Sequence, residues 1–308
     1  MVEHAIVVIA KTRLEQLQTR FNTKAQAKFY VERQGVSFKQ YEDEHEQIQD
    51  TYHTVLNKLN GIIKYKTIDR AFVSSYIFSA NDLVITIGQD GLVANTAKYA
   101  RGIPIVAVNP DVNLFDGVLL PFNFNNFHLA VEKVLHQKFS FKETHFAEAV
   151  LNDGQKLFAF NDFFIGAATH VSARYKITYG SQSEDQSSSG IIISTKAGST
   201  GWLSSVVNMT YGLYNFFDHT APGKKAPVIH DDELLFIVRE PFLSKTSKIG
   251  ITAGKIQNNN KLVIESNMPS AGIIFSDGIE SDFIKFTTGF IATISSSKEK
   301  AILVQKDF

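Results

Sequence analysis

Cysteine is absent from this chain of 308 residues. Its absence excludes disulfide bonds, thiolate metal ligands and a cysteine nucleophile. An excess of charge of one sign is also missing, because 31 Lys and Arg balance 31 Asp and Glu. Charge therefore gives no support to a nucleic-acid or membrane-surface partner. The nine histidines show no metal-binding spacing such as His-Glu-x-x-His, so no metal site is predicted from them.

Long apolar runs are missing as well. No stretch reaches the roughly 20 residues that a membrane-spanning helix needs, and the first residues do not form a charged-then-apolar leader. We therefore expect a soluble, cytoplasmic protein that binds neither nucleic acid nor membrane. The hydrophobic share of 44% over this length is enough for a large core and predicts two domains.

The first part of the chain alternates strand-like and helix-like segments. Segments with helical periodicity separate the apolar, strand-like runs at residues 5–10, 62–68, 83–87 and 105–108. This alternation predicts an α/β domain with a parallel, Rossmann-like sheet over residues 1–138. The helical segments cover residues 11–33, 38–59, 92–101 and 126–137. Within the second helix, the acidic run from Glu42 to Glu46 is expected to be the solvated side.

After about residue 140 the pattern changes to short apolar runs between turn residues. Runs at a spacing of roughly 8–12 residues predict an all-β, sandwich-type domain over residues 139–296. Residues 181–189 are serine-rich and are expected to form a polar loop. The acidic stretch His230 to Glu233 is expected to be an exposed turn, with a cation site as the alternative. The tail, residues 297–308, is expected to pack back on the first domain.

The stretch around residue 90 combines a buried strand, a glycine turn and the start of a helix. The apolar run ends at Gly88, and the helical pattern resumes after Gly91. A strand that ends in glycine and feeds a helix turns backbone N–H groups toward the positive end of the helix dipole, which suits a phosphate. Asp90 is unusual there, because phosphates repel a carboxylate that has no metal ion or reacting hydroxyl beside it. Neither a P-loop nor a dinucleotide fingerprint fits, and an ordinary strand-turn-helix connection is the alternative.

Two further stretches carry candidate residues. Asn161 and Asp162 stand between apolar residues; they are either a turn pair or a clamp in which the carboxylate accepts from ribose hydroxyls. The second stretch follows the strand-like run at residues 191–193 and is rich in small and hydroxyl residues, which offer donors and close approach. A serine-rich turn is the alternative reading. Its candidates are Thr195, Gly198, Ser199 and Thr200.

Taken in order, these three stretches resemble the NAD kinase family. Gly88-Gln89-Asp90-Gly91 is similar to the Gly-Gly-Asp-Gly-Thr signature, which lipid kinases and phosphofructokinases share in part. Asn161-Asp162 resembles the family's Asn-Glu pair, and residues 195–202 resemble its Thr-Pro-Thr-Gly-Ser-Thr-Ala-Tyr. The closer likeness is to the mitochondrial-type branch, which residues 6–13 and 161–166 also fit. Asp277-Gly278 resembles a family Asp-Gly turn, to which no role is assigned.

The resemblance implies an α/β domain joined to a β domain. It implies transfer of a phosphoryl group from ATP, with Mg²⁺, to the 2′-hydroxyl of the adenosine ribose of NAD, giving NADP. Asp90 would receive the hydroxyl proton, and Asn161 and Asp162 would bind NAD. A homodimer or homotetramer is the usual assembly in the family. The other residues implied to contact the nucleotides are Gly88, Gln89, Gly91, Thr195, Gly198, Ser199 and Thr200.

This sequence departs from the family pattern at several positions. Gln89 replaces a glycine and would carry strain of order 1–3 kcal/mol if the position needs positive φ. Leu92 replaces a threonine that could cap the following helix, a loss of roughly 0.5–2 kcal/mol. Asp162 is one methylene shorter than the usual glutamate. Because Asp90 is kept, an active NAD kinase is favoured. A sugar or lipid kinase and a non-catalytic dinucleotide-binding regulator are the alternatives.

Overall fold

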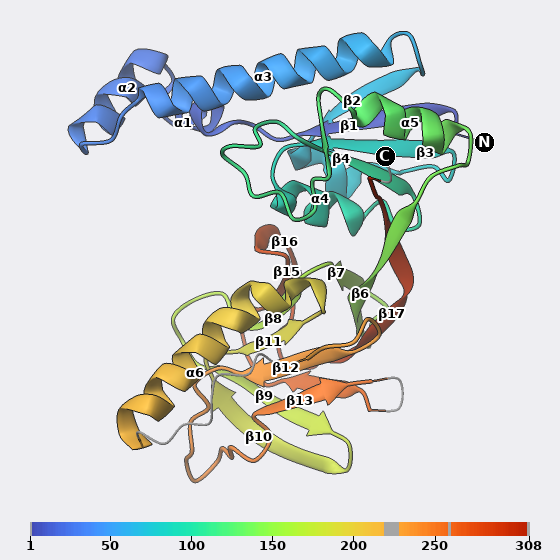
Figure 1. Cartoon of the computed structure of the whole chain (residues 1–308). Coiled ribbons are helices and arrows are strands. Elements are labelled where there is room, and N and C mark those ends of the chain that lie inside the picture. Colours follow the sequence, from blue (N-terminus) through green and yellow to red (C-terminus); the bar gives the residue numbers. More distant parts are fainter. Residues whose placement is uncertain (1, 219–227, 258–259, 307–308) are drawn as a thin grey trace. The chain divides into compact units, whose positions relative to one another are not determined.

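Figure 1 shows the computed structural model, which describes residues 2–218, 228–257 and 260–306. The chain forms two compact units. Unit 1 consists of Met1–Glu143 with Ala301–Phe308, and unit 2 of Thr144–Lys300. Each unit has a hydrophobic core of its own.

Unit 1 is built around a parallel sheet. Its central strand β3 is buried at all six positions, as expected for a strand that is covered on both faces. The strands lie in the order β2 (Tyr65–Asp69), β1 (His4–Ile9), β3 (Asp82–Ile87) and β4 (Pro104–Asn109). Each strand in this order pairs in parallel with the next one. The predicted parallel α/β sheet is therefore confirmed.

Two short pairings complete this sheet on the far side of β4. The last residues of β17 (Ile291–Val304) pair in parallel with the start of β4, and β5 (Phe122–Asn123) pairs with its end. Helices cover the sheet, and Val55 and Phe127 from two of them share the buried core with the strands. These helices are α1 (Arg13–Phe21), α2 (Lys24–Arg33), α3 (Lys39–Leu59), the 3₁₀ helix η1 (Arg70–Ser75), α4 (Asp90–Ala97) and α5 (Phe127–Leu135).

The helical pattern of residues 11–33 forms two helices instead of one continuous segment. Asn22 adopts a left-handed conformation with φ of 63° and ends α1. Thr23 then caps α2, since its hydroxyl accepts the backbone N–H of Gln26 at 3.2 Å. Asparagine tolerates the left-handed region and threonine is a preferred N-cap, so this Asn-Thr pair marks the break.

The acidic run on α3 is only partly solvated, so the expectation that it faces water is wrong for Glu44. That residue is 6% exposed, and its carboxylate pairs with the guanidinium of Arg13. The hydrogen bond to Glu44 raises the pKa of Arg13 above its ordinary value. Arg13 also lies 4.9 Å from the ring centroid of Tyr41. Packing of α1 on α3 brings this cation to Glu44, which the periodicity of α3 alone does not reveal.

Unit 2 packs two antiparallel sheets on one shared core, which includes Phe163 and Ile177. One sheet has the order β13-β12-β11-β8-β15-β16, and the other contains β10-β9-β14-β17. The strand β6 (Phe141–Leu151) pairs with β7 (Lys156–Ala159). The remaining strands are β8 (Asp162–Ala167), β9 (Ala173–Tyr179), β10 (Gln182–Ser188), β11 (Ile191–Ser194), β12 (Leu234–Val238), β13 (Ala253–Ile256), β14 (Leu262–Ser266), β15 (Gly272–Ser276) and β16 (Ile279–Lys285).

The serine-rich stretch at residues 181–189 was expected to be a loop, and this expectation is wrong. It forms β10, which pairs antiparallel with β9 over its whole length. The hydroxyl of buried Tyr175 hydrogen-bonds Gln186 Oε1 at 3.1 Å and Ser188 Oγ at 2.7 Å. Polar side chains on the buried face are thus satisfied by hydrogen bonds, so the strand lacks the apolar alternation that would identify it.

Unit 2 also contains the short 3₁₀ helix η2 (Ala197–Thr200) and the helix α6 (Trp202–Asp218). Both follow β11 in the chain, and η2 contains the candidate residues Gly198, Ser199 and Thr200. Within the described ranges, no helix has the length and apolar character needed to cross a bilayer.

Candidate functional site

The predicted site residues form two groups, one in each unit. In unit 1 they occupy the connection from β3 to α4. In unit 2 they occupy the connections from β7 to β8 and from β11 to α6. The first group is Gly88, Gln89, Asp90 and Gly91, and the second is Asn161, Asp162, Thr195, Gly198, Ser199 and Thr200.

The turn after β3 is packed by the side chain of Leu92. A Cβ at Gly88 would lie 2.9 Å from Leu92 Cδ2, and Leu92 is 3% exposed. Gln89 has φ of −89° and ψ of 166°, which is ordinary extended backbone. The strain that a positive φ would impose on Gln89 is therefore absent. No side chain caps α4, as expected when a leucine replaces the threonine.

Asp90 is the first residue of α4 and is half-buried. Its carboxylate oxygens accept the backbone N–H groups of Val118 at 3.1 Å and Leu119 at 2.9 Å. These amides belong to the loop that follows β4, the parallel neighbour of β3. Asp90 is thus held at the carboxyl edge of the sheet, where open α/β sheets bind ligands. Each oxygen keeps lone-pair capacity for a further partner.

The loop that reaches Asp90 is organised by Asn109 at the end of β4. Its side chain donates to Phe115 O at 3.1 Å and accepts the N–H of Asp111 at 3.0 Å. Gly117 has φ of 64°, and a Cβ there would lie 2.7 Å from Asn109 Nδ2. The sequence analysis identified Asp90 but missed the two amides that hold it, because main-chain donors carry no residue-type signature.

In unit 2 the structure brings the two predicted stretches into direct contact. The hydroxyl of Thr195 lies 2.6 Å from Phe160 O and 3.1 Å from Asn161 O, and its N–H donates to Asn161 O at 2.9 Å. A Cβ at Gly198 would overlap the carbonyl group of Asn161. Only glycine permits this approach. Gly198 therefore allows the stretch at residues 195–200 to pack directly against the turn that contains Asn161.

The neighbouring carboxyl group of Asp162 is buried, with 8% of the residue exposed. Burial, with a smaller contribution from the charge of Asp277, raises the pKa of Asp162 to about 7. No described residue donates a hydrogen bond to this carboxyl group or to the side-chain amide of Asn161. These two side chains therefore keep their hydrogen-bonding capacity for a ligand.

The raised pKa of Asp162 predicts a loss of stability with rising pH. Between the ordinary value of 3.8 and about 7, the native protein holds a proton that the unfolded chain has released. The free energy of unfolding should therefore fall as pH rises through this window. Asp162→Asn, which cannot ionise, should flatten that fall in urea unfolding at about pH 5 and pH 8. An equal change with pH in both proteins would contradict the prediction.

The remaining predicted residues lie at the start of α6. The hydroxyl of Ser199 donates to Lys196 O at 2.7 Å, while Thr200 is exposed. Lys196, which stands where the family pattern has proline, forms an exposed ion pair with Asp231 at 2.9 Å. Such exposed pairs add little stability.

A cavity of about 610 Å³ adjoins this segment within unit 2. Its wall includes Trp202, whose ring stacks on Phe164 with a centroid distance of 5.7 Å and lies beneath the guanidinium of Arg239 at 5.4 Å. The volume falls in the range of small-molecule pockets, roughly 300–1,000 Å³. The wall also includes His170, Ser189, Phe275 and Glu280.

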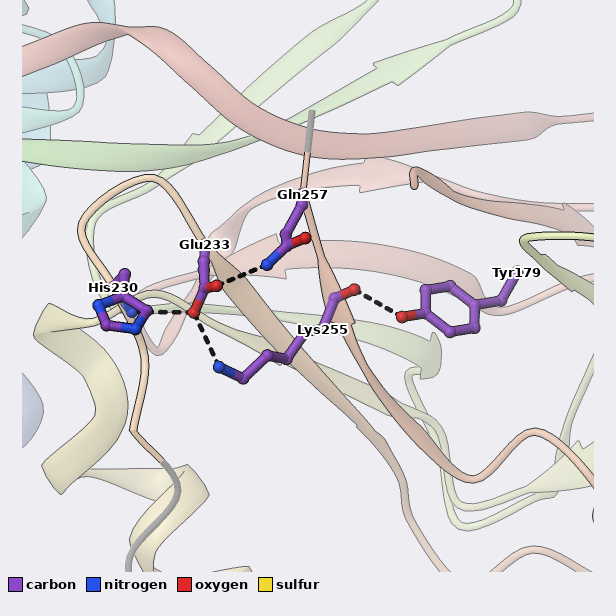
Figure 2. A network of polar contacts seen from close by, with 5 residues as sticks. All are labelled: Tyr179, His230, Glu233, Lys255 and Gln257. Carbon is purple, nitrogen blue, oxygen red and sulfur yellow. Dashed lines mark hydrogen bonds and ion pairs between the residues drawn. The ribbon is translucent and has the colours of Figure 1, made fainter. Parts of the chain in front are cut away.

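The acidic turn at residues 230–233 is a structural network (Figure 2). The carboxylate of Glu233 accepts from the His230 backbone N–H at 3.1 Å, Lys255 Nζ at 2.9 Å and Gln257 Nε2 at 2.6 Å. Its side chain is 8% exposed, so the expectation of an exposed turn is wrong for this residue. Among the described residues, no group of three or more His, Asp or Glu side chains could hold a metal ion.

This network predicts a loss of stability in acid. The hydrogen bond from Lys255 lowers the pKa of Glu233 to about 2 from an ordinary value of 4.5. The stabilisation is therefore present above about pH 4.5 and is lost as the pH falls toward 2. Glu233→Gln should lower the Tm near neutral pH and weaken its fall in acid. Asp232→Asn, at the exposed neighbouring residue, is the control. If the Tm of Glu233→Gln were no lower than the Tm of Asp232→Asn, the role of the network would be contradicted.

No protein-family model matches the chain. An NAD kinase from Caldicellulosiruptor saccharolyticus is 26% identical over 153 residues, which make up 48% of this chain and 57% of that protein. The matched segment thus spans little more than half the length of this curated relative. That similarity agrees with the family resemblance of the three motifs.

Two solved structures share the fold. An NAD kinase from Archaeoglobus fulgidus in complex with ATP has a TM-score of 0.55 at 13% identity, covering 98% of this chain and 94% of that chain. Yeast NADH kinase complexed with NADH has a TM-score of 0.58 at 14% identity, covering 99% and 84%. The chain therefore has the fold of NAD kinases. The narrower likeness to the mitochondrial-type branch stays a prediction.

Proposed function

We propose that this chain, which has the NAD kinase fold, is itself an NAD kinase. The reaction is transfer of the terminal phosphoryl group of ATP to the 2′-hydroxyl of the adenosine ribose of NAD, giving NADP. The observation that carries the proposal is the carboxylate of Asp90, which two backbone amides hold at the carboxyl edge of the parallel sheet. The names and ligands of the similar proteins, NAD kinase, ATP and NADH, support the same reaction.

Asp90 acts as the base in this proposal. A carboxylate can accept the proton of the attacking hydroxyl, because the proton moves as the new O–P bond forms. Transfer of a phosphoryl group depends mainly on positioning and on stabilisation of charge. The fixed orientation of Asp90, with both oxygens already accepting one hydrogen bond, suits this role.

Asn161 and Asp162 bind NAD in this proposal. The amide of Asn161 offers donors and an acceptor, and Asp162 is buried beside it. With a pKa of about 7, Asp162 either donates a hydrogen bond to the ribose as an acid or accepts one as a carboxylate. Thr195, Gly198, Ser199 and Thr200 line the dinucleotide site, and among the residues of η2 the exposed Thr200 offers its hydroxyl group.

Magnesium is proposed to arrive with ATP. Mg²⁺ usually binds through one or two carboxylates together with substrate phosphates. No cage of acidic ligands exists among the described residues, and Asp90 keeps lone-pair capacity on both oxygens. Asp90 therefore fits a Mg²⁺ ion that is bound mainly by the phosphates of ATP. Such an ion would neutralise charge on the transferred phosphoryl group. A homodimer or homotetramer in the cytoplasm is part of the proposal, and light scattering and cell fractionation test it.

The test is an incubation of purified protein with NAD, ATP and Mg²⁺, with NADP measured by an NADP-specific dehydrogenase. NADP should form at a rate that depends on each of the three components. Two alternative functions give different results. Phosphate uptake by a sugar or lipid, and not by NAD, would favour the related kinase suggested by Gln89 and Leu92. Calorimetric binding of NAD without turnover under any donor would favour a regulatory protein.

A further inference from the structure

Asp277 and Gly278 form the two-residue turn that joins β15 to β16. Their φ angles are 55° and 69°, and positive values at both positions define a type I′ hairpin turn, for which Asp-Gly is a preferred pair. A turn of this kind needs no carboxylate, since Asn-Gly and Gly-Gly form it equally well. The aspartate must therefore be explained by what its side chain contacts.

The carboxylate of Asp277 reaches across to the connection between β7 and β8. Its oxygens accept the backbone N–H of Phe160 at 3.0 Å and that of Asn161 at 2.6 Å, and the N–H of Asp162 lies 3.4 Å away. In return, the N–H of Asp277 donates to Asp162 O at 3.0 Å. Three successive N–H groups of the predicted substrate turn thus converge on one side chain that is more than 110 residues distant in sequence.

The opposite side of the same turn is held by Thr195. Its hydroxyl and N–H bind the carbonyl oxygens of Phe160 and Asn161. The main chain of residues 160–162 therefore has its N–H groups bound by Asp277 and its carbonyl groups bound by Thr195 and the backbone of Asp277. The side-chain amide of Asn161 has no hydrogen bond with any described residue. The main chain is fixed, and the side chains of Asn161 and Asp162 are left for a ligand.

We propose that Asp277 is a positioning residue for substrate binding, which fixes Asn161 and Asp162 in the orientation that receives the dinucleotide. This inference rests on the proposed function of those two residues. Only an ionised carboxylate supplies enough acceptor sites for converging N–H groups without adding a donor of its own. The charge of Asp277 also raises the pKa of Asp162, so the same side chain acts on the substrate turn through both geometry and charge.

The test compares Asp277→Gly with Asp277→Asn in the kinase assay. Glycine keeps the type I′ turn without strain and removes the carboxylate contacts to residues 160–162, while the backbone N–H that donates to Asp162 O is kept. Because Asn161 and Asp162 hold substrate before and during the reaction, their loss of orientation should raise KM for NAD by about tenfold and leave kcat within about twofold. Asparagine retains one acceptor oxygen, so Asp277→Asn should show a smaller rise. The KM for ATP should not change.

The matched control is Asp153→Gly. Asp153 and Gly154 form another Asp-Gly turn in unit 2, between β6 and β7, and the Asp153 carboxylate accepts the N–H of Gln155 at 3.0 Å within its own turn. This variant removes a similar carboxylate contact that stays within its own turn and does not reach residues 160–162. It should leave KM for NAD unchanged, and both glycine variants should melt within a few degrees of each other.

The outcomes separate this inference from the proposed function. Unchanged KM for NAD in Asp277→Gly, or an equal rise in Asp153→Gly, would overturn the positioning role while the kinase activity stands. If the wild type forms no NADP, the proposed function fails, and NAD affinity by calorimetry then decides the role of Asp277 on the same variants. A tenfold weaker affinity in Asp277→Gly supports it, and equal affinity, or no NAD binding by the wild type, overturns it.

Discussion

Asp90→Asn is expected to lower kcat for NADP formation by roughly 10²–10⁴-fold, the usual contribution of a positioned base. The amide cannot accept the proton of the attacking hydroxyl. It is nearly the same size as the carboxylate and keeps one oxygen for the N–H of Val118 or Leu119. The fold and the KM for NAD should therefore change little, so the loss appears in kcat.

Asp111→Asn is the matched control for Asp90→Asn. Asp111 lies in the loop that reaches Asp90, and its carboxylate also accepts a backbone N–H, that of Asn113 at 2.9 Å. A change there tests whether loosening the loop alone reduces activity. Near-normal kcat in Asp111→Asn together with the large loss in Asp90→Asn would support the base. Undiminished NADP formation by Asp90→Asn would remove Asp90 from the chemistry.

The parallel sheet of unit 1 was predictable because its strands carry strong local signals. Fully buried strands such as β3 are mostly apolar runs, and the helices between them fix the parallel direction. The break between α1 and α2 at Asn22 and the strand β10 were not predicted. One depends on a single left-handed residue, and the other buries polar side chains that Tyr175 satisfies from a neighbouring strand.

The site shows the same division between local and distant causes. Asp90 stands out in the sequence because a carboxylate is unusual in a turn that suits a phosphate, whereas Asn161 and Gly198 were identified by their resemblance to the family motifs. The contacts that orient them come from elsewhere in the chain. The amides of Leu119 and its neighbour and the carboxylate of Asp277 lie far away in sequence, and hydrogen bonds to the main chain leave no pattern that spacing or periodicity detects.

Structural context also changes the reading of the family departures. Gln89 was expected to be strained only if its position needed a positive φ, and its extended backbone shows that glycine is not needed there. The side chain of Leu92 packs against Gly88, where a Cβ would lie 2.9 Å from Leu92 Cδ2. The leucine at position 92 thus fits the glycine at position 88. The two substitutions nearest Asp90 therefore leave its backbone geometry unstrained, which is consistent with an active kinase.

Gly198→Ala should be a strongly damaging substitution in unit 2. The added methyl group would overlap the carbonyl of Asn161, and neither side can move without cost. Asp277 and Thr195 hold the turn at residues 160–162 from opposite directions. Overpacking of this kind costs typically 1–3 kcal/mol, which corresponds to a fall in Tm of several degrees. Displacement of Asn161 should also raise KM for NAD.

Gly212→Ala separates this clash from the general effect of replacing a glycine. Gly212 lies within α6, and a Cβ there meets no atom within 4 Å. Alanine in a helix interior is favoured over glycine by about 1 kcal/mol, so this variant should be at least as stable as the wild type and bind NAD normally. If Gly198→Ala matched it in both Tm and KM, the two stretches would not need their close contact. The assembly of the dinucleotide site from Asn161, Thr195 and Gly198 would then have to be abandoned.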